Sequence, residues 1–246
     1  MGRPYKNPWI PEAALNILRD EKGSILDVGG SAPFFRATHI LDVAPFDPQG
    51  LQGKCWGGEG RRWTEDQYTL FDLCSGKVWP FKDKTFDLGL CSHTLEDLRD
   101  PLPAVKELLR VCRKVLIICP SRLLEQTRGI SHPRFCGFEH HPWLVFVEDG
   151  VLVFRRKTPI VEFPACHISV PPGCMLEKEK GSMCYYGDNL KVKEWAPWNP
   201  TMDYEEYCKF IAPYKQWRHD LFVHDGKRHD FKYWVWCFRQ RFCGAV

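Results

Sequence analysis

Apolar runs alternate with amphipathic segments in the first half of the chain, a pattern typical of an α/β protein. Apolar residues recur with a helical period in residues 9–20 and 101–112. Short apolar runs predict strands at residues 24–28, 38–43, 67–73, 86–92 and 114–119. Because strands that alternate with helices pair in parallel through right-handed crossovers, we expect a mostly parallel central sheet.

The second half of the chain has a different pattern, in which β-rich runs are separated by irregular stretches. Residues 143–157 contain two such runs joined by Asp149 and Gly150, and this dipeptide favours a tight hairpin turn. A second, weaker pair of strands is expected at 220–224 and 230–239. Residues 162–200 are rich in Pro, Gly and Cys and predict an inserted cap that carries substrate specificity.

The first crossover helix is expected to be very short or absent. Asp27 and Asp42 end the first two strands and are only 42 − 27 = 15 positions apart. A dinucleotide site instead needs G-x-G-x-x-G, a full helix and an acid about 20 residues further on. Pro33 also biases Ala32 away from helical geometry. The spacing therefore favours a ligand that has a ribose but no phosphate, because little helix N-terminus remains to bind phosphate.

Segments that follow one another in the family's order resemble the class I S-adenosylmethionine-dependent methyltransferases of the small-molecule type. Residues 29–37 read GGSAPFFRA, similar to the G-G-G-x-N-P-x-P-R-A loop of one subgroup. Residues 78–111, VWPFKDKTFDLGLCSHTLEDLRDPLPAVKELLRV, are similar to the stretch from the adenine loop through the fourth strand to the next helix. The resemblance covers roughly residues 24–122. It implies a Rossmann-like fold whose mostly parallel sheet is closed by an antiparallel C-terminal strand, with a truncated first crossover and an inserted hairpin and cap.

The resemblance also implies which residues hold S-adenosylmethionine. Asp42 is placed to accept hydrogen bonds from the ribose hydroxyls, as a carboxylate with two oxygens can. The remaining implied positions surround the methionine part, the adenine and the transferring methyl, in that order along the chain. They are Asp27, Gly29, Gly30 and Ser31, then Asp72 and Leu73, then Cys91 and Ser92.

Histidines are the candidate catalytic residues, because an oxygen or nitrogen nucleophile must lose a proton and imidazole titrates near neutrality. His93 matches the family's S-H-x-L-E-H run, whereas Asp97 replaces the second histidine of that run. His140 and His141, in GFEHHPW, resemble the H-x-W segment that precedes the hairpin in the same subgroup.

Composition sets limits on the class of protein. The 246 residues, of which 44% are hydrophobic, suit a single domain with a core at 20–125, a hairpin and cap at 126–205 and closing strands at 206–246. No segment has the length and apolarity of a membrane span or signal peptide, so we expect a cytoplasmic protein that does not enter membranes. A net charge of +3 is too small to indicate nucleic-acid binding by itself.

The chain has twelve cysteines but no C-x-x-C pair. Cysteines and histidines at Cys136, His140, His141, Cys166, Cys174 and Cys184 could hold zinc, yet they lack the paired short spacing of structural sites. We therefore expect free thiols and no bound metal.

The sequence thus predicts a methyltransferase that acts on an oxygen or nitrogen of a small-molecule or glycan-like acceptor. One alternative is a binding or scaffold protein that has lost the cofactor site, because Ser31 and Pro33 replace expected glycines. Another is a nucleic-acid-modifying enzyme, because residues 215–242 are basic and aromatic. The sequence does not specify the oligomeric state.

Overall fold

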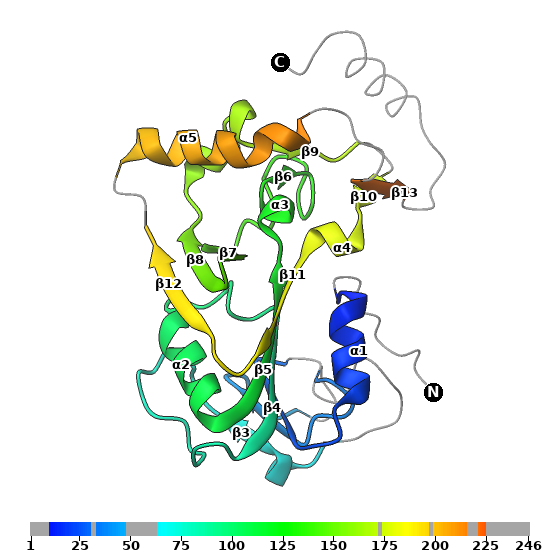
Figure 1. The fold of residues 1–246 in the computed structure, drawn as a ribbon, viewed down its shortest axis with the longest axis vertical. Coiled ribbons are helices and arrows are strands. Elements are labelled where there is room, and N and C mark those ends of the chain that lie inside the picture. The colour runs from blue at the N-terminus through cyan, green and yellow to red at the C-terminus, as the bar shows by residue number, and fades with distance from the viewer. Residues whose placement is uncertain are drawn as a thin grey trace.

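A six-stranded sheet forms one end of an elongated molecule, and α5 with several short strands forms the other (Figure 1). The computed structural model describes residues 10–30, 33–47, 63–171, 174–196, 199–215 and 221–224. Among these residues, no helix is long and apolar enough to cross a membrane.

The sheet has the strand order β11-β5-β4-β1-β2-β3. Its parallel strands are β1 (Ile25–Val28), β2 (His39–Asp42), β3 (Tyr68–Leu70), β4 (Phe86–Ser92) and β5 (Cys112–Pro120). This is a Rossmann-like α/β arrangement in which the chain moves outward from β1 to one edge and then returns to β4 on its other side. No helix joins β1 to β2 in the described residues of that connection, in agreement with the short spacing.

The antiparallel strand at the edge comes from an unexpected part of the chain. β11 (Ser182–Gly187) pairs antiparallel with β5, with Ser182 opposite Pro120 and Gly187 opposite Val115. The sheet was expected to be closed by an antiparallel C-terminal strand, whereas in the described residues the antiparallel strand is β11, which comes from the expected cap. The run at 230–239 and most of the basic segment at 215–242 lie outside the described residues.

Two apolar layers cover the sheet, one on each face. α1 (Glu12–Asp20) packs Ala14 and Leu18 against one face, and α2 (Pro101–Val111) packs Val105 and Leu108 against the other (Figure 1). β5 shows the alternation that this requires. Val115, Ile117 and Cys119 enter the α2 layer, whereas Leu116 and Ile118 enter the α1 layer.

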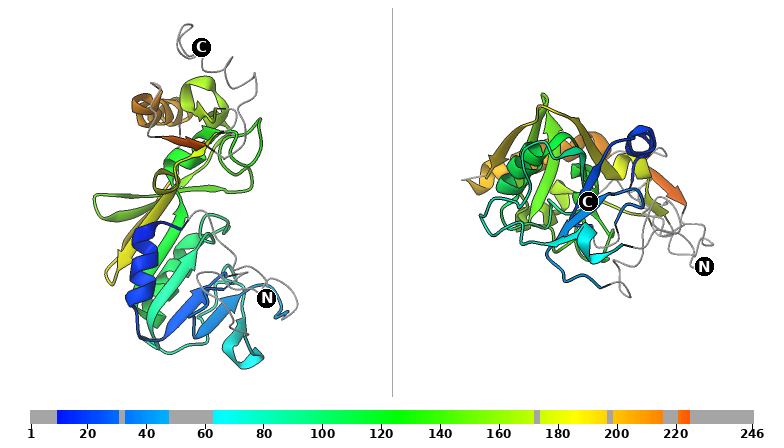
Figure 2. Two further views of the ribbon diagram at one scale, coloured as in Figure 1. Left: turned by 90° about the vertical axis from the view of Figure 1, so that its right-hand side faces the viewer. Right: turned by 90° about the horizontal axis from the view of Figure 1, so that it is seen from below.

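The predicted hairpin is present and extends the α2 layer. β7 (Trp143–Glu148) and β8 (Val151–Arg156) pair antiparallel, and Asp149 and Gly150 turn the chain with φ values of 50° and 75°. β12 (Lys191–Trp195) then pairs in parallel with β8. The side view in Figure 2 shows the hairpin projecting from the middle of the molecule.

The remaining elements are short, except for one helix. α5 (Pro200–Ile211) lies across the end of the molecule away from the central sheet (Figure 1). The predicted strand at 220–224 is observed as β13 (Phe222–His224), which pairs antiparallel with β10 (Cys174–Leu176). The run at 230–239, which was its expected partner, lies outside the described residues. The other elements are α3 (Arg122–Glu125), β6 (Thr127–Arg128), β9 (Ile168–Ser169), β10 (Cys174–Leu176), α4 (Lys178–Gly181), β13 (Phe222–His224) and the 3-10 turns Glu65–Gln67, Pro159–Glu162, Pro164–Cys166 and Ala212–Tyr214.

Candidate functional site

The turn after β1 depends on two glycines. Gly29 has a φ of 72°, a left-handed conformation, and a Cβ at this position would collide with the Thr94 side chain. A Cβ on Gly30 would lie 2.8 Å from the Asp27 carboxylate carbon. The backbone can therefore turn sharply here only because neither residue has a side chain. Ser31 lies outside the described residues.

Asp27 is buried beneath this turn, with 2% of its surface exposed. One carboxylate oxygen accepts a hydrogen bond of 2.6 Å from the backbone N–H of Phe34. Burial raises the pKa of Asp27 to about 7, the Phe34 hydrogen bond opposes the shift, and the nearby charge of Asp42 adds to it. Asp27 is therefore a carboxyl group that a cationic ligand would help to ionise.

Replacing Asp27 with Asn is expected to change how stability depends on pH. The folded state keeps a proton on Asp27 up to a pKa of about 7, whereas the unfolded state releases it near the ordinary aspartate pKa of 3.8, so this group lowers stability as pH rises between those values. Asp27→Asn lacks this titrating group and does not lose stability in this way. The free energy of unfolding of the variant minus that of wild type should therefore rise by on the order of 3 kcal/mol from pH 4.5 to about pH 8. Urea unfolding of both proteins at the two pH values measures this change. If the variant and wild type differ in stability by the same amount at both pH values, the raised pKa of Asp27 is contradicted.

Asp42 ends β2 next to Asp27 and is 4% exposed. Its Oδ1 accepts a hydrogen bond of 2.9 Å from the N–H of Ala44, which fixes the carboxylate. Its Oδ2 is buried and has no hydrogen-bond partner among the described residues. A buried, unpaired carboxylate oxygen is costly unless a ligand satisfies it, so this atom points to a bound donor.

Asp72 and Leu73 follow β3 along the same edge of the sheet. Asp72 is exposed, and its Oδ1 accepts from the N–H of Cys74 at 2.8 Å, forming a local turn. Leu73 is buried in the α2 layer. Asp72 thus keeps its other oxygen accessible, whereas Leu73 can offer only packing and backbone groups.

The carboxyl end of β4 combines strain with unpaired polar atoms. His93 has a φ of 52°, which is unfavourable for a residue with a side chain and is typical of functional sites. Ser92 Oγ and His93 Nε2 are buried and lack hydrogen-bond partners among the described residues. Cys91 is 1% exposed, and burial raises the pKa of its thiol well above the usual value, so its side chain is a core group.

Glu96 is a residue of this edge that sequence reasoning did not identify. It is 1% exposed, and neither carboxylate oxygen has a hydrogen-bond partner in the described part of the chain. Its Oε1 lies 3.3 Å from His93 Nδ1. The apolar periodicity of this segment gives no sign that the acid at position 96 is buried. Only the S-H-T-L-E-D motif could have drawn attention to Glu96.

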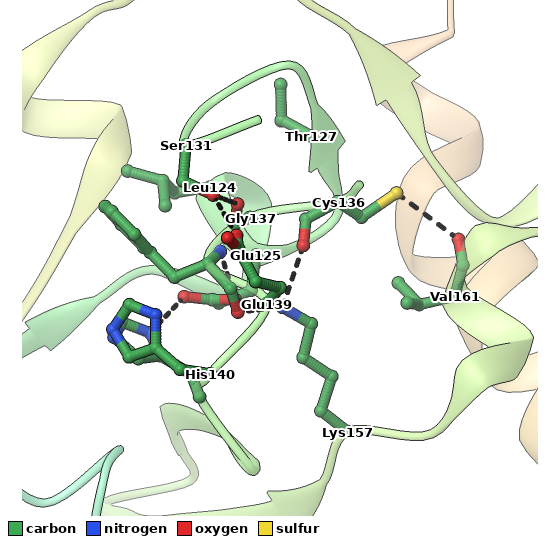
Figure 3. A network of polar contacts seen from close by, with 12 residues as sticks. Leu124, Glu125, Thr127, Ser131, Cys136, Gly137, Glu139, His140, Lys157 and Val161 are labelled. Carbon is green, nitrogen blue, oxygen red and sulfur yellow. Dashed lines mark hydrogen bonds and ion pairs between the residues drawn. The ribbon is translucent and has the colours of Figure 1, made fainter. Parts of the chain in front are cut away.

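His141 is held by a second buried carboxylate, that of Glu125. His141 Nδ1 lies 2.7 Å from Glu125 Oε1, and both side chains are buried. Lys157 Nζ donates to the other Glu125 oxygen at 2.6 Å and to the carbonyl oxygens of Cys136 and Phe138 at 2.8 Å (Figure 3). Burial alone would lower the pKa of His141, but Glu125 and nearby acids outweigh it and raise that pKa. The ring orientation of His141 is therefore fixed.

His140 and Asp97 complete a cluster with His141. Asp97 Oδ1 lies 3.4 Å from His141 Nε2 and 3.8 Å from His140 Nε2. The His140 side chain is 62% exposed, whereas that of His141 is 6% exposed. The histidines expected from sequence thus lie near the carboxyl end of β4, because Asp97 follows this strand by one short turn.

The cysteines that the sequence analysis considered as possible zinc ligands do not join this cluster in the described residues. Cys136 Sγ instead contacts the carbonyl oxygen of Val161 at 3.6 Å (Figure 3). Cys166 Sγ lies 3.8 Å from Cys208 Sγ, on α5. The nine described cysteines are all free thiols, consistent with the expectation from sequence.

The strand order, the glycine turn and the acids at the ends of β1, β2 and β3 define a Rossmann-like protein with a site at the carboxyl edge of its sheet. Residues 59–118 match a family model described as a methyltransferase domain. This part of the chain, which includes β3, β4, α2 and most of β5, is therefore similar to a methyltransferase domain.

Two other comparisons add no functional detail. One solved structure, titled as a complex between the Haloferax volcanii Trm112 methyltransferase activator and a methyltransferase, is 14% identical over 68% of this chain and 83% of the other, with a TM-score of 0.34. No curated protein sequence matches the chain.

Proposed function

We propose that the protein transfers a methyl group from S-adenosylmethionine to an oxygen or nitrogen of a small-molecule or glycan-like acceptor. The observation that supports this best is the unpaired, buried Oδ2 of Asp42 at the end of β2. In a methyltransferase domain, this is the position from which an acid can accept hydrogen bonds from ribose hydroxyls.

The residues around Asp42 fit the other parts of the cofactor. Asp72 has an accessible oxygen that can accept from the adenine amine. Asp27 lies under the glycine turn, and its raised pKa means that a nearby positive charge would stabilise its ionised form. The methionine ammonium supplies such a charge. The proposed cofactor residues are therefore Asp27, Gly29, Gly30, Ser31, Asp42, Asp72, Leu73, Cys91 and Ser92.

The chain's own contribution to the reaction is alignment. The bound cofactor supplies a methyl group on a sulfonium, which is already activated for displacement. The glycine turn and the end of β4 fix the methyl donor relative to the acceptor, and this positioning accounts for most of the rate gain in such a transfer. The strained His93 backbone lies where β4 ends, so it can shape this part of the site.

The acceptor atom must lose its proton, and the polar groups suited to this are the candidate catalytic histidines His93, His140 and His141. A neutral imidazole can take the proton directly. A cation held between imidazoles and a carboxylate can instead lower the pKa of a bound hydroxyl. Both routes can activate an acceptor hydroxyl, so these side chains are compatible with a small polar molecule or a glycan-like one.

Methyl transfer is tested with isotope-labelled cofactor. The purified chain is incubated with S-adenosylmethionine carrying a labelled methyl group and with fractions of small molecules, glycans or RNA. We expect a mass increase of about one labelled methyl group in a small-molecule or glycan fraction. Label in RNA alone would favour nucleic-acid modification, and cofactor binding that is absent at millimolar concentration would favour a scaffold role.

A further inference from the structure

Asp97, His140 and His141 present three potential ligand atoms to one point beside the carboxyl end of β4. One ligand atom from each residue lies within 4.8 Å of the other two, and Asp97 Oδ1 is 3.4 Å from His141 Nε2 and 3.8 Å from His140 Nε2. Ligand atoms around a tetrahedral ion with bonds of about 2.0 Å are about 3.3 Å apart. The observed spacing is therefore close to that of a metal site.

His141 has the orientation of a metal ligand. Because its Nδ1 faces the Glu125 carboxylate at 2.7 Å, this nitrogen can donate to Glu125, and Nε2, which faces Asp97, is the atom available to a metal ion. Glu125 is itself fixed by Lys157 and by the N–H of Phe138, at 2.6 and 3.3 Å (Figure 3). A carboxylate that orients a histidine in this way is the usual support of a metal-binding imidazole.

The surroundings also carry negative charge that no described residue neutralises fully. Lys157 is engaged with Glu125, so it does not balance the others. Glu96 is buried with its Oε1 3.3 Å from His93 Nδ1, and its charge acts on both Asp97 and His141. A cation bound beside Glu96 would offset the cost of burying this carboxylate.

An internal ion pair explains the cluster less well. The separations of 3.4 and 3.8 Å between Asp97 and the imidazoles exceed the length of a charge-assisted hydrogen bond, about 2.7–2.9 Å. His140 is also mostly exposed, and its ring packs against those of Phe138 and His141, with centroids 5.8 and 4.4 Å away. The separations between Asp97 Oδ1 and the imidazole nitrogens instead leave room for a metal ion between them.

We propose that Asp97, His140 and His141 bind a divalent transition-metal cation, and that its open position binds an oxygen of the acceptor. Two imidazole nitrogens and one carboxylate oxygen suit Zn²⁺, and three protein ligands leave a fourth position free. His141 is then a ligand rather than a base, and the metal lowers the pKa of the acceptor hydroxyl. The metal site rests on the cluster alone, whereas the acceptor role rests also on the proposed methyl transfer.

Local sequence patterns do not predict this metal site, because its ligands come from segments that are distant in the sequence. Asp97 follows β4, whereas His140 and His141 precede β7. This is why the sequence predicts no metal, although the two histidines belong to the constellation weighed for zinc.

Metal titration of the purified chain tests the site without cofactor or acceptor. The chelator-stripped protein is titrated with Zn²⁺ by calorimetry and with Co²⁺ by visible absorption, which reports tetrahedral coordination. The variants are His140→Ala, Asp97→Asn and Glu125→Gln, and the control is His132→Ala, an exposed histidine of the same segment. Thermal unfolding of each variant checks the fold, and His140→Ala should leave it intact because that side chain is exposed.

We expect one site whose affinity for Zn²⁺ falls roughly 10- to 100-fold in His140→Ala and Asp97→Asn and about 10-fold in Glu125→Gln. His132→Ala should bind as wild type does. Because every variant keeps the same cysteines, thiol binding cannot produce the difference. Equal affinity in wild type and His140→Ala would overturn the proposal. Cofactor binding without metal binding would refute only this site, and metal binding without cofactor binding would refute only the methyltransferase assignment.

Discussion

Asp42→Asn is expected to weaken S-adenosylmethionine binding roughly 10- to 100-fold, the range for losing hydrogen bonds to a charged acceptor. Asn can keep the bond from Ala44 through its carbonyl oxygen, so the loop after β2 should stay in place. Its NH₂ group would replace the unpaired Oδ2 and cannot accept from ribose hydroxyls. Equilibrium dialysis with labelled cofactor measures the change.

The matched control is Asp66→Asn, an exposed acid just before β3. It should bind cofactor as wild type does, because the same charge is removed outside the site. If both variants lose affinity equally, the effect is one of general charge and Asp42 does not hold the ribose.

Asp203→Ala is expected to destabilise the protein by about 3–5 kcal/mol, because it leaves the buried Arg155 guanidinium with only the more distant carboxylate of Glu206, 3.9 Å away. Asp203 on α5 and Arg155 on β8 are each 1% exposed and are joined by a contact of 2.6 Å between Asp203 Oδ1 and Arg155 Nη2. The guanidinium lies over the rings of Trp195 and Tyr207, with centroids at 4.5 and 4.1 Å, so water cannot readily replace the lost carboxylate. Urea unfolding measures the loss.

Two further variants separate the buried ion pair from general effects on α5. Glu205→Ala removes an exposed acid from the same helix and should change stability by less than about 0.5 kcal/mol. The double variant Arg155→Met with Asp203→Leu removes both charges and should recover much of the stability lost in Asp203→Ala. If Asp203→Ala lowers the free energy of unfolding no more than Glu205→Ala does, the ion pair does not stabilise the packing of α5 on the hairpin.

Local patterns predicted the parallel part of the fold well. β4 has the predicted bounds, and the hairpin turns at Asp149 and Gly150 because these residues accept left-handed conformations. The edge strand β11 was not predicted, because it pairs with β5, which is distant in the sequence, and local hydrophobic periodicity does not reveal such pairing. Residues 182–187 also lie in a segment whose Pro, Gly and Cys content indicates a loop.

In the candidate site, too, local sequence patterns predict some residues and miss others. Asp27 and Asp42 could be predicted because acids that follow apolar strands mark the carboxyl edge of a parallel sheet. Glu96 and Glu125 could not, since buried acids interrupt the apolar pattern from which burial is inferred. The approach of Asp97 to His140 and His141 depends on the path of the chain between β5 and β7, which sequence periodicity does not describe.

A crystal structure of the protein with S-adenosylhomocysteine tests the central claim most directly. The account predicts the adenosyl group at the carboxyl ends of β1, β2 and β3, with a ribose hydroxyl donating to Asp42 Oδ2. A ligand bound elsewhere, or a ribose that does not contact Asp42, would contradict it.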